Sequence, residues 1–372
     1  MTVAFDGSVV RPPYSGVQLS VVAELQALAA ALGDLRGCVF FCGAPEVADS
    51  VRARGGAMGP LPRVAQRVAA RVFWQQLVLP AWLRRNRIEA LHALAYTAPL
   101  RCPVPTVVNI HDVIALESPH LCAPANRLHM RLLLPGTIRR AAALIVSTRH
   151  VAERVQARFG IPWERLTVAP LGVDAARFSA PAPRPEVAGL PAERPYWLFV
   201  GNIEPKKDVG TLLDAYAASA AAQRTDLVVV GRAGWLCQGI VDRLGSWTGP
   251  GRVHWLGRVP AADLPGLLQH ALALVMPSIE EGFGMPVLEA MAAGTPVIHS
   301  DHPALREAAG DAGIGFPRGD AAALSACLDR LAEAASLRHD LAAKGRQHAA
   351  GMTWDRWGCT ALDVVRQVVS QQ

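Results

Sequence analysis

The segment EEGFGMPVLEAMAAGTPV, residues 280–297, places glycines and carboxylates side by side at the start of a helical pattern. Gly282 and Gly284 stand just before a helical pattern, and the unpaired amides of a helix's first turn can hold a phosphate. Glu281 and Glu289 flank that helix start, and carboxylates are good acceptors for vicinal hydroxyl groups. If a diphosphate lies at the helix start, Glu281 can reach a sugar on one side and Glu289 a ribose on the other.

The same segment also allows plainer interpretations. The two glycines suit tight packing, Glu281 suits a partner of the helix dipole, and Glu289 suits a solvated surface acid. The G-x-G-x-x-G fingerprint of dinucleotide-binding folds is absent, because Val287 occupies the place of the third glycine. This absence disfavours an NAD-dependent oxidoreductase.

A second cluster lies in FVGNIEPKKDVGTLLDAYA, residues 199–217, between a strand pattern and a helical pattern. Lys206 and Lys207 are two of only three lysines in the chain, the third being Lys344. Compact ammonium charges at a strand end suit the negative charge that develops on a leaving diphosphate. A solvated pair of loop lysines is the alternative.

A third cluster, in VVNIHDVIALESP, places His111 and Asp112 at the end of a predicted strand. Histidine can donate a hydrogen bond to a sugar hydroxyl or shift a proton, although a strand-end histidine is often structural. No residue stands out as a covalent nucleophile, and the chain has no Asp-x-Asp pair. We therefore expect neither a metal nor a cofactor, with positive protein groups balancing the charge of a diphosphate.

The elements that must position these residues alternate between strand and helix patterns. In the first half, strand patterns lie at TVAFDG, CVFFC, EALHAL, TVVNIHD and AALIVST, and helical patterns at GVQLSVVAELQALAAAL and RHVAERVQARFG. In the second half, strand patterns lie at YWLFVGN, DLVVVGRAG, VHWLGRV, LALVMPS and PVIHS, and helical patterns at DVGTLLDAYAASAAA, DLPGLLQHA and GMPVLEAMAAG. The proline-rich segment APAPRPEVAGLPAERP separates the two halves.

This alternation over 372 residues predicts an α/β protein with two Rossmann-like, doubly wound domains. We expect an N-terminal domain at 1–180, a linker at 181–195 and a C-terminal domain at 196–353. A final helix at about 354–370 is expected to pack back on the first domain. Ligands of such sheets bind at the carboxyl ends of the strands, so a deep cleft between the facing domains is the expected site.

Charge is distributed unevenly between the two halves. Residues 1–185 hold 21 arginines, no lysine and 11 acids, a balance of +10, whereas the whole chain has a net charge of +6. A basic half can meet an anionic membrane or a phosphorylated substrate. It contains no recognisable nucleic-acid motif, so we expect no nucleic-acid partner.

Localisation is expected to be cytoplasmic. The seven cysteines include no Cys-x-x-Cys pair, no apolar run reaches about 18 residues, and MTVAFDGSVVRPP lacks the order of a signal peptide. From Pro60, however, arginines at 63, 67 and 71 form a predicted helical stripe beside valines, followed by Trp74, Trp82 and further arginines. This pattern predicts peripheral contact with an anionic membrane through residues about 60–90; a core-facing helix with a solvated basic face is the alternative.

The segments from FVGN to GTPVI, together with VAPLGVDAARF, resemble retaining glycosyltransferases of the GT-B fold, family 4. The family's E-x7-E signature falls on Glu281 and Glu289. The EPKK version of its basic pair resembles the branch of mannosyl- and rhamnosyltransferases of surface polysaccharide assembly. Many members carry Arg where this chain has Asn202, which leaves open which cation contacts which phosphate.

The resemblance implies a role for each matching residue. Glu281, His111 and Lys207 are expected to be catalytic, and His111 with Asp112 is expected to face the acceptor. Glu281 would contact the donor sugar, Glu289 the ribose, and the loop between them the distal phosphate. The expected donor-binding residues are Gly16, Gly201, Asn202, Lys206, Lys207, Gly257, Val259, Glu281, Gly282, Phe283, Gly284, Met285 and Glu289.

The resemblance further implies metal-independent transfer of a sugar from a nucleotide diphosphate sugar, with retained anomeric configuration. GDP-mannose is the expected donor, and a glycan or lipid-linked glycan the expected acceptor, in polysaccharide biosynthesis. A catalytically silent subunit that binds sugar nucleotide or glycan is the alternative function. The sequence identifies neither the donor sugar and base nor the acceptor and linkage, nor a role for Glu280.

Overall fold

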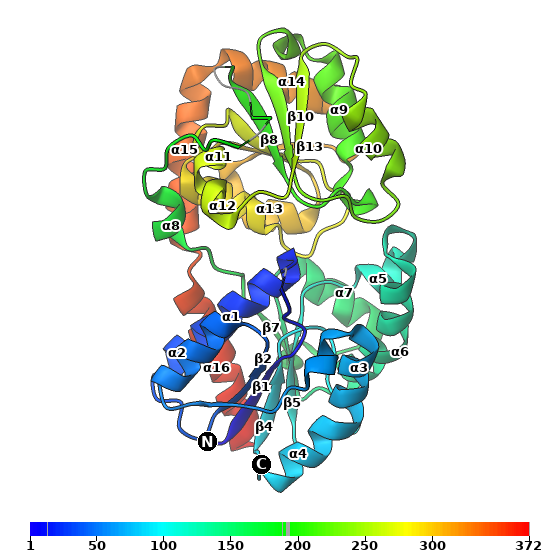
Figure 1. Cartoon of the computed structure of the whole chain (residues 1–372), viewed down its shortest axis with the longest axis vertical. Coiled ribbons are helices and arrows are strands. Elements are labelled where there is room, and N and C mark those ends of the chain that lie inside the picture. Colours follow the sequence, from blue (N-terminus) through cyan, green and yellow to red (C-terminus); the bar gives the residue numbers. More distant parts are fainter. Residues whose placement is uncertain (13, 188, 191–193, 372) are drawn as a thin grey trace. The chain divides into compact units, whose positions relative to one another are not determined.

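Two separate parallel β-sheets organise the chain, and each belongs to its own structural unit (Figure 1). The computed structural model describes residues 1–12, 14–187, 189–190 and 194–371. The first unit comprises Met1–Glu117, Pro124–Gly172 and the chain from Trp354, and the second comprises Ser118–Ala123 and Val173–Thr353. The prediction of two parallel α/β domains is confirmed.

The first sheet has the strand order β3-β2-β1-β4-β5-β6-β7, and all its neighbours pair in parallel. Its central strands are buried along their whole length, as their almost uninterrupted apolar sequences require. The strands are β1 (Val3–Gly7), β2 (Val39–Cys42), β3 (Ala57–Met58), β4 (Ala90–Ala93), β5 (Thr106–Ile110), β6 (Ala143–Val146) and β7 (Leu166–Val168).

Helices cover both faces of this sheet, with α1, α2 and α16 on one side and α3, α4 and α6 on the other (Figure 1). The helical elements are α1 (Gly16–Leu32), α2 (Pro45–Ala53), η1 (Arg63–Gln66), α3 (Val68–Phe73), η2 (Trp74–Val78), α4 (Leu79–Arg85), α5 (Ile114–Glu117), α6 (Pro124–Arg140), α7 (Arg149–Phe159), η4 (Trp163–Arg165) and α16 (Trp354–Ser370). The C-terminal helix α16 packs along α1. A side chain at Gly358 would come within 2.6 Å of the carbonyl oxygen of Ala27, so glycine permits this close approach.

The second sheet has the order β10-β9-β8-β11-β12-β13 and is also parallel throughout. Trp197 and Phe199 on β8, Tyr216 on the following helix and Val275 on β11 belong to its buried core. The strands are β8 (Tyr196–Val200), β9 (Asp226–Val230), β10 (Arg252–Gly257), β11 (Ala273–Met276), β12 (Val297–Ser300) and β13 (Ile314–Phe316).

The helical elements of the second unit connect these strands. They are η3 (Pro119–Leu121), α8 (Ala175–Ser179), η5 (Pro205–Lys207), α9 (Val209–Ala218), η6 (Ala220–Gln223), α10 (Gln238–Gly245), η7 (Ala261–Asp263), α11 (Leu264–Gln269), α12 (Met285–Ala293), α13 (Pro303–Ala309), η8 (Gly310–Ala312), α14 (Ala321–Glu333) and α15 (Ala335–Ala350). The quoted strand patterns all form strands, whereas the two- and three-residue strands β3, β7 and β13 had no such pattern.

The boundary between the units lies earlier than residue 180, where the sequence placed it. The second unit starts again at Val173, whose amide donates to the carbonyl oxygen of Met352 at 2.9 Å. The Gln269 side chain then donates to the carbonyl oxygens of Phe178 and Ala180 at 2.7 and 2.8 Å. With a third bond, from the Ala182 amide to Gln269 Oε1 at 3.0 Å, they fasten the start of the expected linker to α11, which its proline-rich composition did not reveal. Within that expected linker, residues 188 and 191–193 lie outside the described residues.

The prediction of a single amphipathic helix after Pro60 is wrong. Arg67 has extended backbone angles, φ −85° and ψ 134°, so η1 and α3 are separate and the three arginines do not share one helical face. After α3 the chain continues as the π-helical η2, just before Pro80 in α4. Proline has no amide hydrogen to donate in a regular helix.

Candidate active site

Three glycines align the carboxyl ends of β8, β9 and β10 in the second unit. The Gly201 amide donates to Val230 O at 2.9 Å, and the Gly231 amide donates to Gly257 O at 2.7 Å. Gly231 has a φ of 145°, and a Cβ there would lie 1.8 Å from the carbonyl oxygen of Gly201. Only glycine fits at position 231, so the segments that follow β8 and β9 can approach each other closely. Val259, two residues beyond Gly257, is half-buried.

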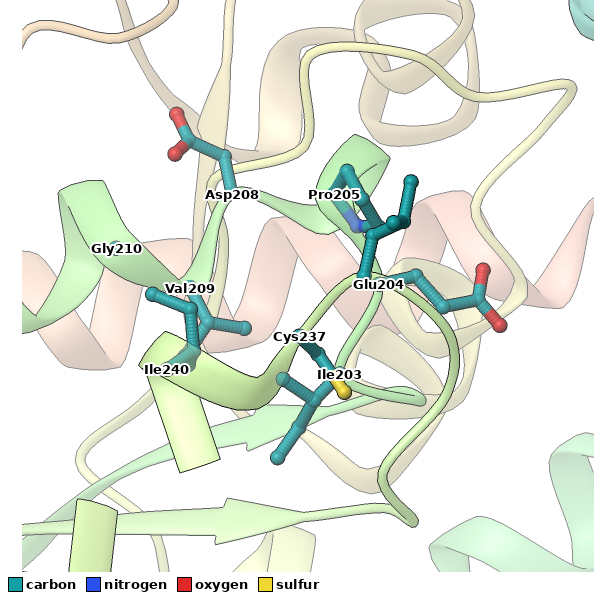
Figure 2. Close-up of a pocket in the computed structure, with 9 residues that line it drawn as sticks. Ile203, Glu204, Pro205, Asp208, Val209, Gly210, Cys237 and Ile240 are labelled. Carbon is teal, nitrogen blue, oxygen red and sulfur yellow. The ribbon is translucent and has the colours of Figure 1, made fainter. Parts of the chain in front are cut away.

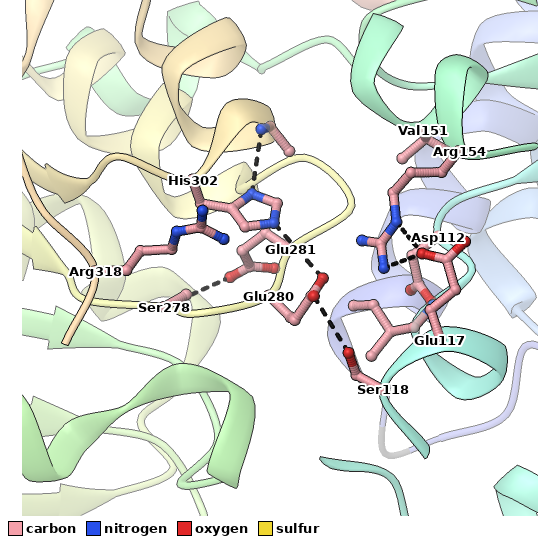
Figure 3. Close-up of polar contacts among 12 residues, drawn as sticks. Asp112, Glu117, Ser118, Val151, Arg154, Ser278, Glu280, Glu281, His302 and Arg318 are labelled. Atoms are coloured by element: carbon pink, nitrogen blue, oxygen red, sulfur yellow. Dashed lines mark hydrogen bonds and ion pairs between the residues drawn. The ribbon is translucent and has the colours of Figure 1, made fainter. Parts of the chain in front are cut away.

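The ammonium of Lys207 donates directly to the carboxylate of Glu281, and both side chains are largely buried. Their segments are held together by the backbone, because the Ile279 amide donates to the carbonyl oxygen of Lys206 at 2.9 Å. Ser278 donates to the same carboxylate oxygen of Glu281 at 3.1 Å (Figure 3). The structure therefore joins two residues that are far apart in the chain and that the sequence assigned to one site.

Opposing influences act on the Glu281 carboxyl. Burial raises its pKa, but the positive charge of Lys207, then that of Lys206, and the hydrogen bonds from Lys207 and Ser278 lower it. The net effect holds the pKa of Glu281 below its usual range, so it is a carboxylate at neutral pH. Ser278 had no signal in the sequence beyond ending a strand pattern.

Helix α12 begins directly after the glycine loop. Gly284 is its N-cap with φ 107°, and a side chain there would come within 2.5 Å of Leu305 Cδ2. Pro286 occupies the first turn, where its missing amide hydrogen costs nothing. The neighbouring Phe283 is buried, and Gly282 and Met285 are half-buried. The backbone amides of this helix start are therefore held rigidly beside Glu281.

Glu289 lies in the second turn of α12 and is half-buried. Burial raises its pKa to about 7, and the positive charge of Arg177 on α8 opposes that rise. Within the described part of the chain, its carboxyl makes no hydrogen bond or ion pair with another side chain. A half-buried acid without a protein partner is a group placed to accept hydrogen bonds from a ligand.

Asn202 and Lys206 both turn to Glu204. Asn202 Nδ2 donates to Glu204 Oε1 at 3.2 Å, and Lys206 Nζ lies 3.9 Å from Glu204 Oε2. Burial raises the pKa of Glu204, opposed by the charge of Lys206 and the bond from Asn202. Glu204 also lines a cavity of about 170 Å³ with Cys237 and Ile240, shown in Figure 2. Lys207, not Lys206, is thus the lysine that contacts the E-x7-E acid.

Glu280 contacts protein groups on two sides. His302 Nε2 lies 3.6 Å from Glu280 Oε2, and Ser118 Oγ donates to Glu280 Oε1 at 3.3 Å (Figure 3). His302 is the N-cap of α13, and its Nδ1 accepts from the Ala304 amide at 3.2 Å, which leaves the proton on Nε2. Glu280 therefore has a structural environment that the sequence could not assign.

In the first unit, His111 follows β5 and is largely buried. Its Nε2 donates to the carbonyl oxygen of Leu94 at 2.9 Å, and its Nδ1 faces Glu24 Oε1 at 3.9 Å. Glu24 is fully buried on α1, where it accepts from Asn109 Nδ2 at 2.9 Å. Burial raises the pKa of Glu24 to about 7, against the lowering effects of His111 and Asn109. Both ring nitrogens of His111 are thus directed at protein groups.

Sequence reasoning missed Glu24, although a signal existed. It is the only charged residue in the 17-residue segment Gly16–Leu32, whose other positions are mostly apolar. A lone acid on a helix that must be buried is a group with a specific partner.

Asp112 and Gly16 complete the predicted residues of the first unit. The two Asp112 oxygens accept from Tyr96 Oη at 2.7 Å and from the Ile114 amide at 3.0 Å, so Asp112 anchors the start of α5. Gly16 opens α1, and among the described residues a Cβ there would meet no atom within 4 Å. Open space therefore adjoins this helix start; the preceding Pro13 lies outside the described residues.

Two family models match the two halves of the chain. Residues 14–177 match Glycosyltransferase Family 4, and residues 184–348 match Glycosyl transferases group 1. Over 98% of both chains, this protein is 27% identical to the O-antigen chain mannosyltransferase B of Escherichia coli. The chain belongs to the GT-B glycosyltransferases related to family 4.

Solved structures of this glycosyltransferase fold are similar over nearly the whole chain. Sucrose-phosphate synthase from Thermosynechococcus elongatus has a TM-score of 0.75 and 20% identity, with 100% of this chain and 99% of that chain covered. The Anabaena protein HepE, solved with UDP-glucose, has a TM-score of 0.71 and 17% identity, with 98% and 99% covered. Among the residues that the structure describes, no group of three or more His, Cys, Asp or Glu is placed to hold a metal.

Proposed function

We propose that this glycosyltransferase moves mannose from GDP-mannose to a hydroxyl group of a glycan or lipid-linked glycan in polysaccharide assembly, with retention of anomeric configuration. The observation that carries the proposal is the joined pair of Lys207 and Glu281 at the rigid start of α12, with Glu289 one turn further on. The similarity to an O-antigen mannosyltransferase along almost the entire chain supports the mannosyl donor.

The second unit supplies the donor site in this proposal. The amides at the start of α12 bind the distal phosphate, and Lys206 and Lys207 neutralise the departing diphosphate. Glu281 accepts from hydroxyls of the donor sugar and Glu289 from the ribose. The backbone at Gly201, Gly257 and Val259 meets the nucleotide. The UDP-glucose complex of the structural relative HepE supports a nucleotide sugar as donor.

The direct bond between Lys207 and Glu281 has a chemical consequence. The carboxylate keeps Lys207 charged and aimed at the helix start, so the ammonium is pre-organised before charge develops on the leaving diphosphate. Glu281 in turn stays ionised and can accept strong hydrogen bonds from the sugar. The acceptor hydroxyl attacks the same face from which the diphosphate departs, and the leaving phosphate takes its proton.

The first unit supplies the acceptor side. His111 contacts Leu94 and Glu24. Asp112 accepts hydrogen bonds from Tyr96 and Ile114, so both side chains are held in place at the carboxyl end of β5. Gly16 lets the diphosphate approach the start of α1. We propose that no metal or other cofactor takes part, because the two lysines and the helix amides supply the positive charge.

A panel of GDP-, UDP- and dTDP-sugars, scored by thermal shift of the full chain, tests the donor. A ligand at 100 times its dissociation constant stabilises the folded state by about 2.7 kcal/mol. We expect GDP-mannose to give the largest shift, and a larger shift with a UDP- or dTDP-sugar would overturn the donor assignment. Binding without slow hydrolysis of any donor would instead favour the catalytically silent alternative.

A further inference from the structure

The exposed large apolar side chains of the first unit gather on two neighbouring segments. Of eleven such side chains among the described residues, seven lie on the chain from η1 to η2 or on α6. Single exposed apolar residues are ordinary, whereas a concentration of them indicates an interaction surface. We call these two segments the basic–apolar face.

The segment from η1 to η2 is firmly anchored to the core, so loose packing does not explain why its apolar side chains are exposed. Trp74 is buried edge-on against Phe41 at a ring distance of 5.2 Å, and Gln75 Nε2 donates to Asp6 Oδ2 at 2.7 Å. Their neighbours Phe73 and Leu77 are 61% and 62% exposed. The turn therefore directs one set of side chains into the core and holds bulky apolar ones in solvent.

Helix α6 repeats this arrangement. Met130 and Leu134 are buried, whereas Leu128 and Leu132, one turn apart, are 61% and 67% exposed. Arg127 and Arg131 precede these two leucines, and both are exposed, so a basic row runs beside an apolar row. The sequence pattern predicts membrane contact only through residues about 60–90, and the structure adds α6.

The two segments adjoin each other through the loop at residues 98–100. The Gln76 side chain on η2 accepts from the Leu100 amide at 2.9 Å, and its amide group donates to Ala98 O at 3.0 Å. The same loop meets α6, because a Cβ at Gly136 would lie 2.8 Å from Leu100 Cδ2. Burial and the nearby positive charge of Arg71 on α3 both lower the pKa of His129 on α6. The exposed residues thus form one face.

Charge on this face has a single sign. Residues 63–78 hold three arginines and no acid, and α6 holds four arginines and no acid. Within the described residues, Arg63, Arg67, Arg127 and Arg131 form no ion pair. Cations next to apolar side chains complement an anionic lipid surface, where the arginines meet head groups and the apolar residues enter the interface.

We propose that the basic–apolar face docks on a membrane containing anionic phospholipids. The first segment of the face reaches the carboxyl end of β1, because Gln75 on η2 donates to Asp6 Oδ2 near the end of that strand. Parallel sheets bind ligands at that end of their strands, so a docked protein could receive a lipid-linked acceptor. In the described part of the chain, no helix has the length and apolarity to cross a bilayer. The docking proposal does not depend on which sugar nucleotide is the donor.

Vesicle co-sedimentation of the full chain tests the proposal. We expect binding to vesicles of phosphatidylcholine with phosphatidylglycerol, little binding to phosphatidylcholine alone, and weaker binding as salt is raised. We expect two double variants of α6 to reduce the bound fraction about tenfold or more each. One carries Arg127→Glu and Arg131→Glu, and the other carries Leu128→Ser and Leu132→Ser. These residues belong to the first unit and are not among the proposed donor-binding residues, so the thermal shift with a sugar nucleotide should stay as in the wild type.

A control variant carries the same types of substitution at exposed residues outside the basic–apolar face, Arg52→Glu and Leu236→Ser. It should bind vesicles as the wild type does. Equal binding to neutral and anionic vesicles, no binding at all, or wild-type binding by both α6 variants would overturn the proposal. Concentration-dependent dimers that disappear in the α6 variants, without vesicle binding, would assign the face to a second copy of the chain. Because donor binding is measured separately, the failure of docking is distinguishable from the failure of the proposed transfer reaction.

Discussion

Glu281 and Glu289 belong to one motif, yet their pKa values move in opposite directions. Lys207 and Lys206 hold the pKa of Glu281 low, whereas burial raises that of Glu289 to about 7. The first acid is therefore fixed as an anion, and the second changes its charge near neutral pH. This difference has a measurable consequence for donor binding at the residue scale.

Replacing Glu289 by Gln should weaken the binding of GDP by roughly 10- to 100-fold, the loss of one charge-assisted hydrogen bond to the ribose. Wild-type affinity should rise with pH through about 7, as the carboxyl ionises, and this rise should be smaller in the variant. Isothermal titration calorimetry with GDP and with dideoxy-GDP measures both effects. Equal losses for the two ligands would contradict a ribose contact.

Replacing Glu24 by Gln should remove a pH-dependent loss of stability. The folded-state pKa of about 7 exceeds the ordinary 4.5, so between these values the folded protein keeps a proton that the unfolded chain releases. The stability contribution is complete below pH 4.5 and falls as pH rises to 7, by about 3 kcal/mol for a shift of this size. Urea unfolding of both proteins at pH 5 and pH 8 measures it.

The Gln variant retains the acceptor for Asn109, so its stability should depend less on pH than that of the wild type. Identical pH profiles in the two proteins would show that Glu24 does not titrate in this range.

The positions of Glu281 just before α12 and of Glu289 in its second turn could be predicted from the sequence, because the strand pattern, the glycines and Pro286 mark where that helix begins. The partners of His111 could not, since Leu94 and Glu24 reach it only through the packing of β4 and α1 against β5. Likewise, nothing in the sequence showed that Asn202 and Lys206 turn to Glu204 and leave Lys207 for Glu281.

Two helix starts show what glycine does at the scale of elements. At the start of α12, Gly284 combines a φ of 107° with no room for a side chain. At the start of α1, no atom of the described residues lies within 4 Å of a Cβ placed at Gly16. The backbone conformation at the first position favours glycine strongly, and the second position is a proposed point of ligand approach.

Gly284→Ala should therefore destabilise the protein by about 1–3 kcal/mol, whereas Gly16→Ala should leave the free energy of unfolding nearly unchanged. Gly16→Ala should instead raise the KM for the donor, because a methyl group then occupies the space proposed for the diphosphate. Urea unfolding and steady-state kinetics of both variants provide the comparison. Unaltered kinetics in Gly16→Ala would remove Gly16 from the donor site.

Long periodic elements were predictable, and short or irregular ones were not. The helix Gly16–Leu32 matches its quoted pattern from end to end. The break at Arg67 and the π-helical turn at Trp74–Val78 were missed, because the burial of Trp74 and Gln75 overrides a four-residue spacing of arginines. Tertiary packing decides such local choices.

At the scale of the whole molecule, each unit carries its own sheet and its own set of proposed binding residues. The donor residues depend on lysines, helix amides and acids, so transfer should not require a divalent metal. Turnover by the purified chain should change by less than about twofold in EDTA. Strict dependence on added Mg²⁺ or Mn²⁺ would contradict this expectation.

The most direct test of the account is the release of nucleoside diphosphate from GDP-mannose by the full chain and its Glu281→Ala variant. We predict release by the wild type and a loss of roughly 100-fold in rate, about 3 kcal/mol, in the variant. Glu333→Ala, which removes an exposed acid of the same unit, serves as the matched control and should react at the wild-type rate. No release by the wild type, or equal rates in the Glu281→Ala variant, would contradict the account.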